Sequence, residues 1–151
     1  MKYTDNVSNK LNELLEKTYD AERGYKLAAE KVENPTVKRF LNDKVQQRYA
    51  FGLELKKEIR QYGRLPDKGG SFAGDMHRIW MNLSSTLSPN DTERVLEEVE
   101  RGEKASLEQY DEVLQDKELT LAPTTENLLK KQREAVKAAM VLAEKYEETV
   151  A

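Results

Sequence analysis

The chain has 151 residues, of which 25 are Lys or Arg and 28 are Asp or Glu, so its formal net charge is -3. It has one His and no Cys, which excludes disulfides, thiolate metal sites, iron–sulfur clusters, cysteine nucleophiles and any site that needs two imidazoles. With 7 Gly, 4 Pro and 35% charged residues, the composition favours long helices with wide solvated faces.

Four stretches have the apolar spacing of helices and together predict an all-α protein, with a single domain over residues 1–151. No stretch alternates with the period of a strand. Asn34 before Pro35 is typical of an N-cap followed by proline in the first helical turn, and Gly63 is typical of a helix C-terminus. The expected helices cover about 5–33, 35–62, 89–116 and 124–149.

The lengths of the connections predict the topology. The first two helices are joined by two or three residues and the last two by about eight, so each pair is expected to form an antiparallel hairpin. The segment 63–88, with a short helix at about 71–86, is long enough to run along a helix of roughly 42 Å. We therefore expect a ferritin-like four-helix bundle with one long crossover; the alternative is an up-down-up-down bundle with this segment folded over one end.

Three segments resemble a known family. They are DAERGY at 20–25, GGSFAGDMHRIW at 69–80 and EEVERGE at 97–103, of which the middle one is the most specific. Together they resemble an uncharacterised bacterial family catalogued as domain of unknown function 2383, which is usually placed with the ferritin-like four-helix bundles. The resemblance covers nearly the whole chain in order and spacing. It implies the crossover topology, and it implies no activity.

Ferritin-like bundles often hold two metal ions with a Glu from each of two helices and Glu-x-x-His from each of the others. The single His, His77, follows Gly74 at that spacing, so the motif does not occur. On each helix, the apolar residues at steps of three and four are interrupted by one polar residue. If the inward face continues through that position, one polar residue on each helix faces the core. These residues are Glu22, Arg48, Glu103 and Gln132.

We hypothesise that Arg48 stands where such a site would place its cation, in a buried network with Glu22, Glu103 and Gln132 to which Tyr25 or Tyr110 could donate. A guanidinium is permanently charged and binds carboxylates in a bidentate manner, so it can neutralise buried acids. One alternative is that these residues lie at stripe edges and point to water. Another is an all-carboxylate iron or manganese site that uses Glu22, Glu100 and Glu103.

The expected function is that of a non-catalytic helical bundle, with no catalytic residue and no cofactor, which works as a stress-adaptation or protein-interaction module. The alternatives are a di-iron or di-manganese protein and a carrier that holds an apolar ligand in the core or beside Trp80. His77 lacks an assignable nucleophile, so it is expected to cap or pack the short helix.

The charge is uneven and bears on partners and location. Residues 35–64 carry eight basic side chains against three acidic ones, a net of +5, whereas residues 91–118 carry four against eleven, a net of -7. This asymmetry favours self-association into a homo-oligomer and disfavours nucleic acid, because the acidic helix repels phosphates. The longest apolar run, 138–143, is too short to span a bilayer, and the N-terminus lacks a signal-peptide pattern, so a cytoplasmic protein without a membrane partner is expected.

Overall fold

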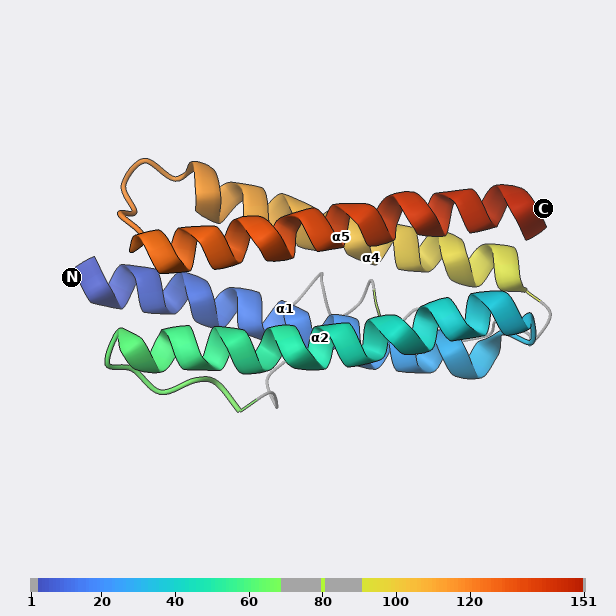
Figure 1. Ribbon diagram of the computed structural model, residues 1–151, viewed down its shortest axis with the longest axis horizontal. Helices are drawn as coiled ribbons and strands as arrows, with labels where there is room; N and C mark the ends of the chain where they lie inside the picture. The colour runs from blue at the N-terminus through green and yellow to red at the C-terminus, as the bar shows by residue number, and fades with distance from the viewer. Residues whose placement is uncertain (1–2, 69–79, 81–90, 151) are drawn as a thin grey trace.

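Four long helices make up the computed structural model, which describes residues 3–68, 80 and 91–150 (Figure 1). They confirm the all-α four-helix bundle, and each end lies within three residues of its predicted position. The short helix expected at about 71–86 lies outside the described residues, apart from Trp80. The helices are α1 (Tyr3–Lys31), α2 (Pro35–Gln61), α4 (Thr92–Gln115) and α5 (Pro123–Val150).

The predicted turn signals act at both ends of α2. The Asn34 side chain accepts hydrogen bonds from the amides of Thr36 and Val37 at 3.0 and 3.1 Å, which satisfies two donors that the first helical turn leaves open. Beyond the other end, Gly63 adopts a φ of +78°, a conformation that an L side chain rarely adopts and that commonly follows a helix.

The helices pair as two antiparallel hairpins, α1 with α2 and α4 with α5, and the hairpins pack through α1 against α4 and through α2 against α5. The helices α2 and α4 lie diagonally across the bundle and run in the same direction (Figure 1). The end of α2 and the start of α4 therefore lie at opposite ends of the bundle. This is the topology with one long crossover that ferritin-like bundles share.

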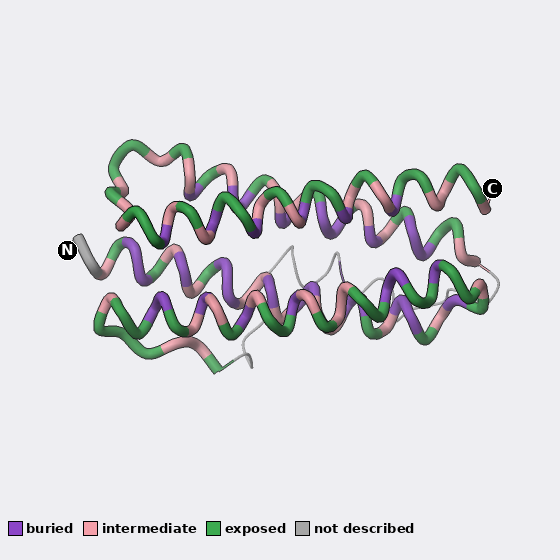
Figure 2. Tube along the Cα trace, viewed as in Figure 1, coloured by how far each residue is buried: buried purple, intermediate pink, exposed green. Residues whose placement is uncertain are grey.

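The buried side chains line the inward faces of all four helices (Figure 2). They form two apolar clusters, one at each end of the bundle, and burial of each large aliphatic side chain contributes about 1.5–3 kcal/mol. Polar side chains that are themselves buried lie between the clusters. One cluster includes Tyr25, Phe40, Trp80 and Leu96, and the other includes Leu11, Leu55, Tyr110 and Leu129.

A small polar cluster joins the end of α2 to the start of α5. The Thr125 hydroxyl donates a hydrogen bond to the buried Glu58 carboxylate at 2.6 Å, and the Tyr62 hydroxyl lies 3.0 Å from the same Thr125 oxygen. The Tyr62 oxygen also accepts from the Ala122 amide at 3.1 Å. These bonds hold the two hairpins together at the end of the bundle opposite the apolar cluster that contains Tyr25, Phe40 and Trp80.

Candidate functional site

A buried ion pair crosses the centre of the bundle. Arg48 of α2 donates from both terminal nitrogens to the two carboxylate oxygens of Glu103 on α4, at 2.6 and 2.5 Å. The side chains are 2% and 0% exposed. Because α2 and α4 are diagonal and have no backbone contact among the described residues, this pair links the two hairpins directly through the core.

Aromatic rings cover the guanidinium. Its central carbon lies 5.4 Å from the centre of the Tyr25 ring and 5.6 Å from that of Phe51, within the range of cation–π attraction, and its Nε donates to Gln47 at 3.3 Å. Burial alone would lower the pKa of Arg48, but the charge and hydrogen bonds of Glu103 outweigh that effect and raise it. The guanidinium therefore stays charged at neutral pH.

Tyr25 lies beside both members of the pair. Its ring is fully buried, and its hydroxyl has no well-aligned hydrogen-bond partner among the described residues. Burial first, and then the nearby Glu103 carboxylate, raise the pKa of Tyr25 well above its ordinary value. The phenol therefore stays neutral and cannot supply a second negative charge to Arg48.

Gln132 of α5 belongs to a second polar group in the same region. Its amide oxygen accepts from the Tyr110 hydroxyl at 2.6 Å, and its amide nitrogen donates to Glu54 at 3.1 Å and to the Phe51 carbonyl at 3.4 Å. Burial raises the pKa of Tyr110, so this phenol is also neutral and serves as a donor. These bonds tie α5 to both α2 and α4.

A cavity of about 10 Å³ lies between the ion pair and the Gln132 group. Such a volume corresponds to about one water molecule, so this part of the core has no space for an apolar ligand. Its lining includes Thr18, Arg48, Ser106, Tyr110 and Val136.

Trp80 from the crossover packs between α1 and α4. Its indole is 1% exposed and lies 5.3 Å, centre to centre, from the Tyr25 ring. The backbones of Gly24 and Gly102 approach the two edges of the indole so closely that a methyl group at either position would overlap the ring. One residue from each of the three segments that carry the family resemblance thus meets here, namely Gly24, Trp80 and Gly102, and Tyr25 connects them to the Arg48–Glu103 pair.

Glu22 does not belong to this layer, in contrast to the predicted network. The buried spacing of α1 runs through Thr18, Ala21 and Tyr25, so Glu22 lies one position round the helix, at a half-buried place. There it lines a hollow on the outer face of the α1–α2 hairpin, where burial raises its pKa while Arg23 and Lys56 oppose that shift. Ala21, which is 1% exposed, occupies the inward position that the prediction gave to Glu22.

The three residues of the alternative metal site lie in three different surroundings. Glu103 is engaged by Arg48, Glu22 faces the outer hollow, and Glu100 lies beside Glu147 of α5. Within residues 3–68, 80 and 91–150, no three His, Asp or Glu side chains are grouped so that they could hold a metal ion. Glu22, Glu100 and Glu103 are therefore not arranged like the carboxylates on facing helices that hold the dinuclear centre of ferritin-like proteins. His77 lies outside the described residues.

Sequence reasoning missed the part played by two mid-helix glycines. Gly24 and Gly102 each end a Glu-Arg-Gly triplet, one on α1 and one on α4. A glycine inside a helix costs roughly 1 kcal/mol relative to alanine, so two such glycines in matching contexts are a signal of close approach. No sequence pattern indicated the buried Glu58–Thr125 contact, because the irregular loop between α4 and α5 determines where Thr125 lies.

Fold and site together define a four-helix bundle with one long crossover and a charged pair at its centre. A family model described as Domain of unknown function (DUF2383) matches residues 6–116, which include α1, α2, the crossover and α4. The chain belongs to this family, as its three motif segments indicate. No curated protein matches the sequence. No helix in the described part of the chain is long and apolar enough to cross a membrane.

Proposed function

We propose that this protein is a non-catalytic, ferritin-like bundle that works as a protein-interaction module, with an ion pair in the place of a metal centre. The observation that carries the proposal is the bidentate Arg48–Glu103 pair, which is almost completely buried at mid-height between two apolar clusters. The guanidinium already supplies the positive charge that a core carboxylate requires. Its role is to fix how the two hairpins dock.

The outer surface supports the interaction role. Tyr49 and Leu53 of α2 and Val141 of α5 are 53%, 48% and 40% exposed, although they belong to well-formed helices. The basic α2 and the acidic α4 lie at diagonal corners of the bundle, so opposite charges face opposite sides of the molecule. Contiguous exposed apolar patches with surrounding charge are typical of surfaces that bind other proteins.

Metal loading tests the first half of the proposal. Protein produced in iron- or manganese-supplemented medium and purified without chelators is expected to contain substoichiometric metal by plasma mass spectrometry. Added Fe²⁺ or Mn²⁺ is also expected to leave the thermal midpoint of the wild type unchanged, because only a ligand that binds the folded state raises it. A stoichiometric metal that is lost in Glu103→Gln and kept in the exposed control Glu108→Gln would overturn the proposal.

A further inference from the structure

The helix α5 has a second regular face besides the one in the core. Its buried residues Leu129, Gln132, Val136, Ala139 and Ala143 follow one another at steps of three and four. Six exposed residues repeat the same steps two positions further on, which places them about 200° round the helix, away from the core. These residues, termed the α5 seam, are Lys131, Glu134, Ala138, Val141, Lys145 and Glu148.

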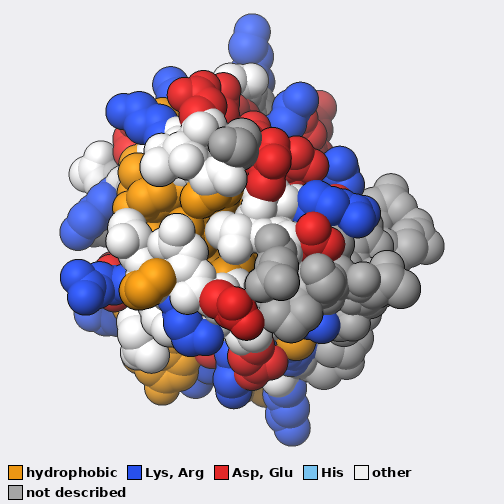
Figure 3. Space-filling model, turned by 90° about the vertical axis from the view of Figure 1, so that its right-hand side faces the viewer, with side chains coloured by type: hydrophobic (Ala, Val, Ile, Leu, Met, Phe, Trp, Pro, Cys, Tyr) orange, Lys and Arg blue, Asp and Glu red, His pale blue; other side chains and the backbone are white. Residues whose placement is uncertain are grey.

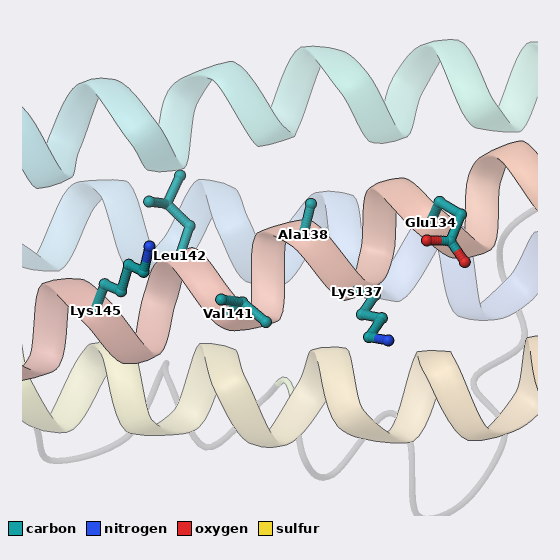
Figure 4. A pocket seen from close by; sticks show the side chains of 6 residues that line it. All are labelled: Glu134, Lys137, Ala138, Val141, Leu142 and Lys145. Atoms are coloured by element: carbon teal, nitrogen blue, oxygen red, sulfur yellow. The ribbon is translucent and has the colours of Figure 1, made fainter.

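The middle of the α5 seam is apolar and hollowed. Ala138 and Val141 lie in a surface hollow of about 400 Å³, whose lining side chains all come from α5 (Figure 4). Lys137 and Leu142 flank it on either side of the seam, and Glu134 and Lys145 close its two ends. Steps of three and four with apolar residues at the centre are the spacing of a coiled-coil seam.

The charges of the α5 seam are complementary to themselves under a two-fold axis. If α5 of a second copy runs antiparallel with its Val141 opposite Ala138, the same register sets Glu134 opposite Lys145 and Lys131 opposite Glu148. Each of these contacts then occurs twice, as an isologous interface requires.

Other arrangements of the two helices are unfavourable. A shift by one heptad in either direction sets Lys145 or Lys131 against Val141, and a parallel pairing sets Glu134 against Glu134 and Lys145 against Lys145. Like charges opposite each other, or charges against apolar side chains, cost binding energy. The register with Ala138 opposite Val141 is the one in which every charged residue of the seam meets an opposite charge.

We propose that the α5 seam is a self-association surface, on which α5 of a second copy binds antiparallel around Ala138 and Val141 to give a two-fold symmetric dimer. This inference rests on the proposed interaction role and names the partner as another copy of this chain. Glu134 is available for the contact, because its side chain is 68% exposed even though it also accepts a bond from Arg133 at 2.7 Å. Lys137 of each copy lies near Glu144 of the other in this register, which adds a further opposite-charge contact at the rim.

Charge exchange within the α5 seam tests the register. The wild type is expected to approach twice its 17.4 kDa mass with rising concentration in sedimentation equilibrium. Glu134→Lys and Lys145→Glu are each expected to stay monomeric, because each sets like charges against each other at both symmetric contacts. The double variant E134K/K145E restores both contacts, and so does an equimolar mixture of the two single variants, so both are expected to dimerise.

Glu126→Lys is the matched control, since it makes the same charge change on the same helix outside the α5 seam and is expected to dimerise like the wild type. Circular dichroism is expected to show that each variant keeps its helices, because none of the substituted residues is buried in the core. A wild type that stays monomeric at its highest soluble concentration would overturn the inference. A dimer that E134K leaves intact, for example through the basic and acidic faces of α2 and α4, would do so as well. Neither result bears on the metal content, so this inference and the proposed function can fail separately.

Discussion

At the centre of the bundle, Arg48 makes contacts that a lysine could not. The guanidinium fork engages both oxygens of Glu103, while its flat faces lie against the Tyr25 and Phe51 rings. It also spans the diagonal of the bundle, which requires a long side chain. A buried pair of this kind adds little net stability, because burial removes both charges from water, but loss of one partner leaves the other charge unpaired.

Arg48→Met is therefore expected to lower the free energy of unfolding by about 3–5 kcal/mol. The double variant R48M/E103L removes both charges and is expected to recover most of that loss, because well-packed apolar replacements of buried ion pairs are often neutral or stabilising. Urea denaturation followed by circular dichroism measures both values. Lys57→Met, at an exposed position on the same helix, should change stability by no more than about 0.5 kcal/mol. A loss in R48M no larger than in this control would contradict the expectation.

Glu147 near the end of α5 makes stability depend on pH. Burial first, and then the neighbouring carboxylates of Glu100, Glu97 and Glu144, raise the pKa of Glu147 from 4.5 to about 7. The folded state therefore binds more protons than the unfolded state between these two values, so the free energy of unfolding falls as pH rises through that range. This end of the molecule faces the viewer in Figure 3, where groups of acidic side chains lie between basic ones.

Glu147→Gln is expected to flatten that slope and to stabilise the protein above pH 7 by about 0.5–1 kcal/mol, a figure reduced for solvent screening of a partly exposed group. Denaturation midpoints measured between pH 4.5 and 8 test this, with the exposed Glu30→Gln as the control that should retain the wild-type slope. An unchanged slope in E147Q would show that other groups cause the dependence.

At the scale of elements, the crossover is held to the bundle by Trp80, and the helices that receive it have glycine at the two points of contact. An alanine at Gly24 or Gly102 would gain roughly 1 kcal/mol of helix propensity, but its methyl group would overlap the indole. The overlap involves the rigid ring system rather than the end of a flexible chain. Relief therefore requires Trp80 to move out of its place between α1 and α4.

Gly24→Ala and Gly102→Ala are each expected to destabilise the protein by about 1–3 kcal/mol, the usual cost of overpacking. Gly52→Ala is the matched control. A methyl group there would meet Leu15 and Tyr19 at an ordinary 3.9 Å, so helix propensity should prevail and raise stability by up to about 1 kcal/mol. In a Trp80→Ala background the cost of G24A should vanish. A cost that persists without the indole would assign it to another cause.

The sequence predicted the helices because each carries a continuous apolar stripe with Asn34, Pro35 or Gly63 as a boundary signal. It also placed Arg48 and Glu103 on inward faces, since their neighbours at steps of three and four are apolar. It misplaced Glu22, because in a long helix the stripe drifts, and Ala21 and Glu22 both lie near its edge. Alanine contributes little to an apolar stripe, so the packing against the neighbouring helices decides whether Ala21 or Glu22 faces inward.

At the scale of the whole molecule, the basic helix α2 and the acidic helix α4 lie at diagonal corners of the bundle. The net charges of +5 over residues 35–64 and -7 over residues 91–118 come from helices with no backbone contact among the described residues. The Arg48–Glu103 pair joins these two helices across the core. We expect that a bundle with apolar side chains alone at this height could dock its hairpins in several ways of similar energy.

The double variant R48M/E103L tests this specificity apart from stability. In the wild type, any shift of one hairpin against the other separates the two charges within the core, which is strongly unfavourable. In the double variant the shifted arrangements carry no such penalty, so we expect extra or broadened amide peaks in two-dimensional ¹H–¹⁵N spectra at unchanged helix content. Leu55→Met, a swap of similar volume in the neighbouring apolar cluster, should keep one sharp set of peaks. One sharp set from R48M/E103L as well would mean that apolar packing alone specifies how the hairpins dock.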